Sequence, residues 1–200
     1  MGALRTAFEA VPPNGAETPP RSGEAPENFV MRLSLSKARE VSRRVGDAIV
    51  VGADTAVVVD GVVLGKPVDP EDAVAMLARL RGRTHRVVTG VTVFDGACGD
   101  SRTICKSTDV LMRQYSDEEI SAYVASGGPF DKAGGYAVQD VAFRPADSVD
   151  GCYLNVVGLP LCETVTLLAE IGADNELKIG WWPPAECADC PLSVDGEVGR

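Results

Sequence analysis

The sequence predicts an α/β domain built around a mixed β-sheet. Three observations lead to this class: apolar stretches of strand length, helices with clear start and stop signals, and at least one hairpin turn. The hairpin turn is Asp60-Gly61, a pair that tolerates positive φ. One strand pair is thus a hairpin, whereas other strands are joined through helices, and this combination indicates a mixed sheet.

The helices are the best-signalled elements. Pro26 suits the first turn of a helix over 26–46. Asp69 caps a second helix that Pro70 starts and Gly82 stops. Ser116 and Glu119 form a capping box for the third. The expected elements in chain order are helix 26–46, strands 48–54 and 56–65, helix 70–82, strands 84–96 and 107–115, helix 116–128, a glycine-containing loop 131–139 and helix 158–172.

Composition excludes several classes of protein. The hydrophobic content of 45% and charged content of 24% are those of a globular domain, and no apolar run approaches the ~20 residues of a membrane helix. The net charge of −10 argues against stable nucleic-acid binding, although a few local cations suffice for a small anionic ligand. Without the features of a signal peptide at its start, the chain is expected in the cytoplasm. A homodimer is one assembly that the sequence leaves open.

The cysteines give weak signals. Cys187 and Cys190 form one C-x-x-C, but His85 is the only histidine, so a structural zinc site within one chain is not favoured. A redox pair or a half-site completed by a second subunit stays open beside an incidental pair. Both cysteines lie in an extension expected to be irregular, residues 172–200, which follows the domain of residues 1–171.

Polar residues interrupt the apolar stretch 50–67. Asp54 and Thr55 are expected at a strand end and Lys66 at the end of the next strand, where α/β sheets usually bind ligands. Asp54 suits a metal ion or a water, and Lys66 suits a phosphate. From these residues alone, a turn or bulge at Asp54-Thr55 and a solvated strand end at Lys66 are the favoured explanation.

The joint pattern resembles the Maf family of nucleoside triphosphate pyrophosphatases. The stretches that carry the resemblance occur in family order across roughly residues 8–171: GEAPENFVMRLSLSKA, VVGADTAVVVDGVVLGKP, GRTHRVVTGV, SDEEISAYVASGGPFDKAGGYAVQ and GCYLNVVGLPL. The resemblance implies a single elongated α/β domain with a twisted sheet, flanking helices and a deep nucleotide cleft, similar to inosine triphosphate pyrophosphatase. It implies cleavage of a nucleoside triphosphate to the monophosphate and pyrophosphate.

Residue roles follow from the resemblance. Asp54 in GADT matches the catalytic acid, expected to activate water with Mg²⁺ or Mn²⁺ nearby. Lys66 in GKP and Lys132 in DKAG match lysines that face the phosphates. Glu17, where the family has an Asp-Glu pair, and Lys37 in LSKA match supporting positions, with Asp54 and Glu17 as the metal ligands. For Lys37, a solvated helix face is the alternative.

Thr55 and Gln139 match the specificity positions. The branch of the family with loops of the DKAGGYAVQ type is associated with dTTP and UTP, whereas another branch prefers methylated guanine nucleotides. A Gln amide offers a donor and an acceptor, which suits the edge of a pyrimidine. A loop residue that bonds only to backbone is the alternative for Gln139. His85 is expected to support its strand rather than to perform catalysis.

The chain departs from the family pattern at its start. Family members open with a β-strand and an S-x-S-P-R-R loop that binds phosphates, and neither Arg5 nor Arg21 has this context. The missing strand would leave an unpaired sheet edge. Either the natural protein is longer, or the chain is a degenerate member. The main functional hypothesis is therefore a pyrophosphatase that acts on dTTP, UTP or modified relatives of these nucleotides and keeps them out of nucleic acids. The alternative is a catalytically impaired nucleotide-binding protein in septum formation or cell-division control.

Overall fold

The computed structural model describes residues 7–15, 17–173 and 187. The elements of this part of the chain are α1 (Pro26–Val45), β1 (Ile49–Val59), β2 (Val62–Leu64), α2 (Pro70–Leu80), β3 (Thr84–Asp95), β4 (Ser101–Met112), α3 (Asp117–Ala125), the 3-10 helix η2 (Ala133–Gly135), β5 (Ala146–Asp150), α4 (Tyr153–Val157) and α5 (Leu161–Glu170).

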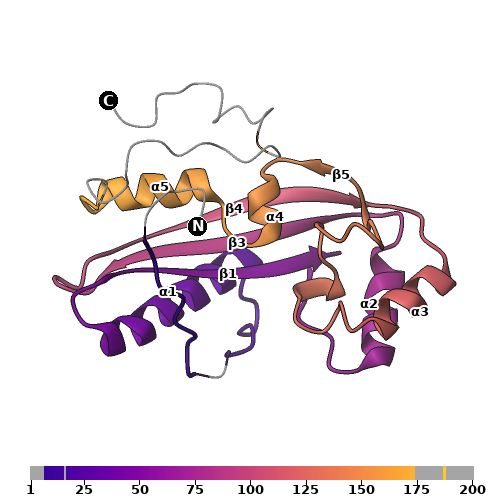
Figure 1. The fold of residues 1–200 in the computed structure, drawn as a ribbon, viewed down its shortest axis with the longest axis horizontal. Coiled ribbons are helices and arrows are strands. Elements are labelled where there is room, and N and C mark those ends of the chain that lie inside the picture. Colours follow the sequence, from indigo (N-terminus) through magenta and orange to yellow (C-terminus); the bar gives the residue numbers. More distant parts are fainter. Residues whose placement is uncertain (1–6, 16, 174–186, 188–200) are drawn as a thin grey trace.

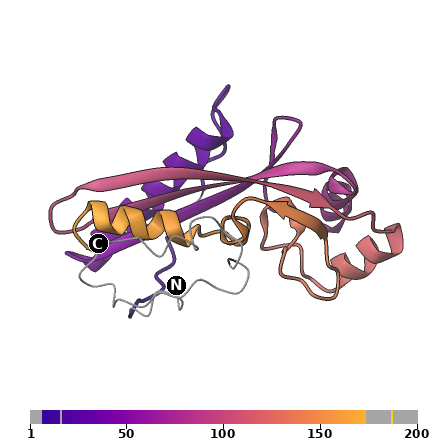
Figure 2. The same cartoon turned by 90° about the horizontal axis from the view of Figure 1, so that it is seen from above.

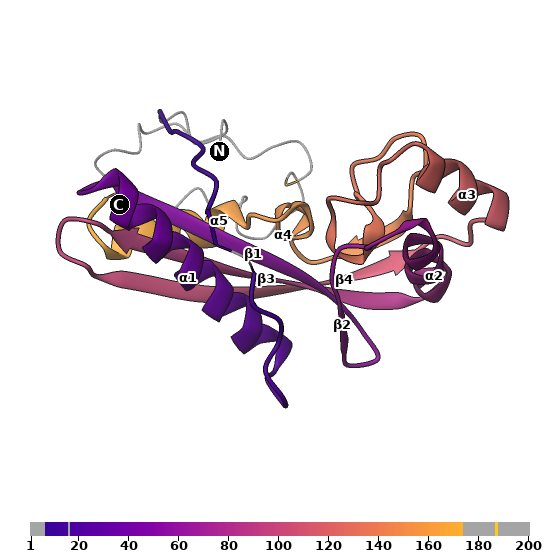
Figure 3. The same cartoon turned by 90° about the horizontal axis from the view of Figure 1, so that it is seen from below.

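The molecule is elongated along a single twisted sheet (Figure 1). α1 covers one face of the sheet, whereas α4 and α5 lie on the opposite face, as the view from above also shows (Figure 2). α2 and α3 pack together beyond one end of the long strands (Figure 3). None of the described helices is both long enough and apolar enough to cross a membrane.

The sheet has the strand order β2-β1-β3-β4-β5, and every neighbouring pair is antiparallel. The α/β class is confirmed, but the sheet is not mixed as expected. The reason is the position of β1. β2 and β3 are joined through α2 and do run in the same direction, but β1 lies between them, so no parallel pair forms.

Helix signals in the sequence translate into the helices observed. The side chain of Asp69 accepts from the backbone N–H of Asp72, and Pro70 opens α2. Ser116 and Glu119 make both bonds of the capping box of α3. The hairpin is also as expected, since Asp60 and Gly61 have φ of 53° and 73°. β5 and α4 are not among the elements that the sequence predicted.

Two glycines let α1 pack directly on the sheet. A Cβ atom at Gly52 of β1 would lie 2.5 Å from the carbonyl oxygen of Ser34, and one at Gly90 of β3 would lie 2.5 Å from the backbone of Val30. Any larger residue would push the helix away. Because Ser34 and Lys37 are neighbours on the surface of α1, this close approach brings Lys37 to the strand that carries Asp54.

Candidate active site

A cavity of about 290 Å³ opens beside β1. All seven candidate residues from the sequence contribute to its lining: Glu17, Lys37, Asp54, Thr55, Lys66, Lys132 and Gln139. They come from the segment before α1, from α1, from β1, from the segment after β2, and from the loop around η2. Arg21, by contrast, lies on the exposed segment before α1, where its backbone N–H donates to Glu24, and it does not line the cavity.

Asp54 and Thr55 lie inside β1 and not at a strand end, which corrects the expectation. They pair with Gly90 and Thr89 of β3, and β1 continues to Val59 because no turn interrupts it. Successive side chains of a strand point to opposite faces, so Asp54 faces α1 and Thr55 faces α4. Within the described part of the chain, β1 has no strand partner on its outer edge before Val57. The cavity lies at this edge and is therefore lined from both faces.

The α1 face supplies a charged cluster. Lys37 Nζ lies 2.5 Å from Asp54 Oδ1 and 2.7 Å from Glu17 Oε1. Burial lowers the pKa of Lys37, but its bonds to Asp54 and Glu17 outweigh that effect and raise the pKa overall. Burial raises the pKa of Asp54 against the opposing pull of Lys37. The bond from Lys37 holds the pKa of Glu17 below its usual value. The cluster therefore keeps a carboxylate and an ammonium in contact at the cavity wall.

Lys66 and Lys132, the lysines matched to phosphate-binding positions, lie on two segments that are joined by a backbone hydrogen bond. Lys66 is exposed in the segment between β2 and α2. Lys132 immediately precedes η2, donates to the carbonyl of Gly128 at 3.2 Å and forms an ion pair with Asp131. The backbone N–H of Gly134 donates to the carbonyl of Gly65 at 2.9 Å. This bond brings both lysine-bearing segments to the same end of the cavity.

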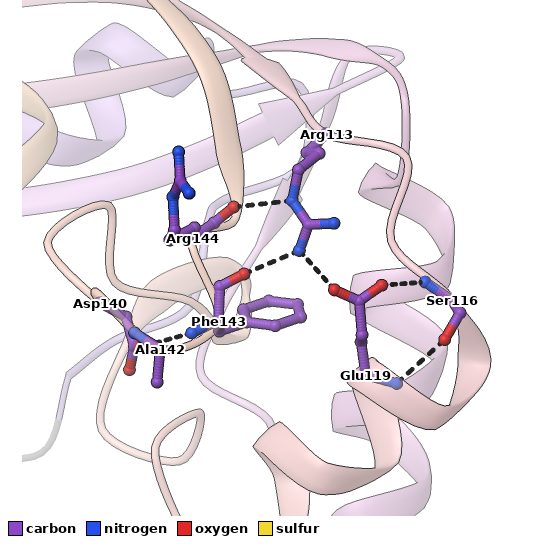
Figure 4. Close-up of polar contacts among 7 residues, drawn as sticks. All are labelled: Arg113, Ser116, Glu119, Asp140, Ala142, Phe143 and Arg144. Carbon is purple, nitrogen blue, oxygen red and sulfur yellow. Dashed lines mark hydrogen bonds and ion pairs between the residues drawn. The ribbon is translucent and has the colours of Figure 1, made fainter.

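The loop 131–145, which carries Lys132 and Gln139, is held by Arg113 at the end of β4 (Figure 4). The guanidinium donates from Nη2 to the carbonyl of Phe143 at 2.8 Å and from Nε to that of Arg144 at 3.1 Å. Nη2 also contacts Glu119 Oε1 at 2.7 Å. One side chain therefore links the loop to the N-terminus of α3.

Internal contacts give the same loop its shape. Asp140 Oδ1 accepts from the backbone N–H groups of Ala142 and Phe143, as Figure 4 also shows. The ring of Phe143 stacks on that of Tyr123 with centroids 4.3 Å apart. Tyr123 also accepts from the backbone N–H of Ala137 through its hydroxyl oxygen. Gln139 is exposed and lines the cavity. The loop is held by hydrogen bonds both before and after this residue.

The α4 face of β1 supplies neutral groups. Thr55 Oγ1 lies 2.9 Å from Thr89 Oγ1, and Thr89 donates to the carbonyl oxygen of Asn155 at 3.1 Å. Sequence reasoning did not assign Thr89. The available signal was a hydroxyl inside the apolar run VVTGV of a central strand.

His85 lies outside the cavity lining and is buried. Its Nε2 contacts the hydroxyl of Tyr136 at 2.6 Å, while its Nδ1 is buried without a hydrogen-bond partner. Burial lowers the pKa of His85 to about 4. The neutral ring therefore anchors Tyr136, a cavity residue, to β3.

Two further expectations from the sequence concern a metal ion at Asp54 and Glu17 and the cysteine pair Cys187 and Cys190. No cluster of three or more His, Cys, Asp or Glu side chains suited to a metal occurs among the described residues. Asp54 and Glu17 nevertheless offer two carboxylates at one cavity wall, which suits Mg²⁺ because that ion takes one or two carboxylates together with substrate phosphates. Cys187 is buried, but Cys190 and most of the segment 172–200 lie outside the described residues.

Comparison with known proteins identifies the family of this chain. The sequence profile of the family described as Maf-like protein matches residues 1–171. A protein of Thermomicrobium roseum named dTTP/UTP pyrophosphatase is 47% identical over 195 residues, covering 96% of this chain and 88% of the relative. Proteins with the same name from Dehalococcoides mccartyi and Geotalea uraniireducens are 39% and 48% identical over 94% and 76% of this chain, and 84% and 78% of their own lengths. The chain therefore belongs to the family of Maf-like proteins.

Proposed function

We propose that this protein is a nucleoside triphosphate pyrophosphatase that hydrolyses dTTP and UTP to the monophosphate and pyrophosphate. The observation that supports this most strongly is that seven residues, matched to family positions from the sequence alone, line one cavity. The names of the relatives support the same substrates. Removal of such nucleotides limits their incorporation into nucleic acids, and we place the reaction in the cytoplasm, where that pool is used.

In the proposed mechanism Asp54 is the general base. Its carboxylate takes a proton from water, the water oxygen bonds to the α-phosphorus, the α–β bridging bond breaks, and pyrophosphate leaves with the bonding electrons. The raised pKa of Asp54 favours this role, because a base accepts a proton more readily as its pKa approaches the working pH. Lys37 opposes too large a rise by pairing with the carboxylate.

The triphosphate requires positive charge on several sides. Lys66 and Lys132 would contact phosphate oxygens from the two tied segments, as point charges on flexible stems. A divalent ion, Mg²⁺ or Mn²⁺, would be held by Asp54 and Glu17 together with the substrate and would neutralise charge during the displacement. Lys37 bridges these two carboxylates in the absence of substrate.

The base would bind at Gln139 and Thr55. Gln139 offers an amide donor and acceptor from the loop, and Thr55 lines the same cavity from the sheet. A site built on hydrogen bonds rejects a ligand with the wrong pattern, because its own polar groups are then left unpaired. dTTP and UTP are therefore expected to be cleaved ahead of CTP, ATP and GTP.

The test is product analysis over this panel of nucleotides with Mg²⁺ present. We expect the nucleoside monophosphate and pyrophosphate in equal amounts, with dTTP and UTP first. Release of orthophosphate and a diphosphate would place the cleaved bond elsewhere, and a clear lead for GTP or a methylated guanine nucleotide would contradict the base assignment. Nucleotide binding without turnover would instead favour the alternative, a catalytically impaired member of the family.

A further inference from the structure

The proton of the Thr55 hydroxyl has a determined direction. Thr55 and Thr89 are opposite each other on β1 and β3, with their Oγ1 atoms 2.9 Å apart. Thr89 is fully buried and donates to the carbonyl oxygen of Asn155 at 3.1 Å. A threonine hydroxyl has one proton. Both contacts are hydrogen bonds at the same time only when Thr89 donates to the carbonyl, which cannot donate, and Thr55 donates to Thr89.

The hydrogen bonds from Thr55 to Thr89 and from Thr89 to Asn155 form a relay, which ends at the backbone carbonyl of Asn155. The position of this carbonyl is itself fixed. The side chain of Asn155 is fully buried, and its Nδ2 donates to the carbonyl of Val87 and to Thr108 Oγ1, each at 3.0 Å. Thr108 in turn donates to the carbonyl of Cys152 at 3.2 Å. These bonds join α4 to β3 and β4, so the relay has its direction before any ligand binds.

Thr55 also forms part of the wall of the cavity. Thr55 is part-buried and belongs to the cavity lining. Gly158, with φ of 116°, is the residue next to it, and a Cβ atom there would lie 3.5 Å from Thr55 Oγ1. Glycine at this position leaves no side chain that would contact the hydroxyl from this side. Because its proton points to Thr89, the hydroxyl presents only lone pairs to a ligand.

We propose that Thr89 and Asn155 are positioning residues that make Thr55 an obligatory acceptor, which selects the N3–H group of uracil and thymine against cytosine. This inference rests on the proposed function. Uracil and thymine carry a proton on N3, whereas N3 of cytosine carries a lone pair. Thr55 therefore bonds to the first two bases and faces the lone pair of the third, and two acceptors that face each other at this part-buried position are both left unpaired.

Calorimetric binding of α,β-methylene-UTP and α,β-methylene-CTP tests the proposal. Thr89→Val keeps the size of the side chain but frees the Thr55 proton to turn toward the ligand. We expect the ratio of affinities, UTP analogue to CTP analogue, to fall about tenfold, and Thr89→Ser to restore it. Thr89→Ala removes the same hydroxyl and replaces the valine variant should that one not fold.

The matched control is Thr92→Val. Thr92 lies on the same strand, is equally buried, and bonds to Ser34 and Thr103 instead of a cavity residue. Its loss is expected to lower stability while the affinity ratio stays as in the unsubstituted protein.

Three results would overturn the inference: no preference for the UTP analogue in the unsubstituted protein, an unchanged ratio in Thr89→Val, or the same change in Thr92→Val. Because binding needs no hydrolysis, the outcome is separate from that of the proposed function. A protein that prefers the UTP analogue but hydrolyses no nucleotide would contradict the pyrophosphatase and not the relay.

Discussion

The two faces of β1 differ in how they hold their polar groups. On the α1 face Asp54 is paired with Lys37, and Lys37 with Glu17, whose side chain is 52% exposed. On the α4 face Thr55 is bonded to Thr89 and through it to Asn155, both fully buried. The polar groups of the first face are charged and partly exposed, whereas those of the second are neutral and mostly buried.

This difference matches two tasks. Attraction between charges is long-range and weakly directional, so flexible lysines and carboxylates suit a triphosphate whose position changes during reaction. Recognition of a base depends on which partner donates, so it needs hydroxyls and amides whose directions are set by buried bonds. We expect the α1 face to determine the rate and the α4 face to determine the choice of base.

The largest effect is expected from Asp54→Asn. The variant keeps the shape and the oxygen that contacts Lys37 but removes the base. Turnover of every nucleotide is expected to fall by ~10²–10⁴, as measured by pyrophosphate release, while the temperature of unfolding stays close to that of the unsubstituted protein. Pyrophosphate release at a near-normal rate would show that another group activates water.

Acid is expected to destabilise the folded protein through protonation of His85. Its pKa in the folded state is about 4, against an ordinary value of 6.5, so the unfolded chain binds the proton more readily between these values. The stabilising contribution is therefore complete above pH 6.5 and is lost as the pH falls toward 4. The free energy of unfolding is expected to fall by ~1.4 kcal/mol per pH unit in this window.

Denaturant unfolding at several pH values measures this contribution, and His85→Gln is the comparison. The glutamine variant is expected to lose the part of the slope that His85 causes, because Gln does not titrate. Parallel slopes for the two proteins between pH 6.5 and pH 4 would assign the acid sensitivity to carboxylates instead.

A smaller effect is expected from Gln139→Ala. Loss of one hydrogen-bonding pair to the base corresponds to ~0.5–1.5 kcal/mol, so the preference for dTTP over CTP is expected to shrink by roughly tenfold or less. The phosphate contacts come from other residues, so the maximal rate with dTTP should change little. A uniform loss of rate for all nucleotides would assign Gln139 to the chemistry and not to the base.

Local signals predicted the helices and the hairpin well. The caps at Asp69 and Ser116 and the turn at Asp60-Gly61 are short-range features, and each is where the sequence indicated. The antiparallel order of the sheet was not predictable in this way. It depends on β1 lying between β2 and β3, and no local pattern specifies which strands become neighbours.

The candidate active site likewise depends on contacts between distant residues, which local sequence patterns do not specify. The candidates Asp54 and Lys37 were found through motif resemblance, but their contact depends on Gly52 and Gly90, which let α1 approach the sheet. Thr89 was missed because a buried threonine in a strand is unremarkable until its partners are known. The roles of the seven cavity residues stay predictions.

The most direct test of the separation between the two faces is to measure kcat/KM for UTP and CTP in Asp54→Asn and Thr55→Val side by side. We predict that Asp54→Asn lowers both values by the same large factor, so their ratio is unchanged. Thr55→Val should reduce the ratio while UTP is still cleaved within about tenfold of the normal rate. A changed ratio in Asp54→Asn, or an equal loss for both nucleotides in Thr55→Val, would contradict the account.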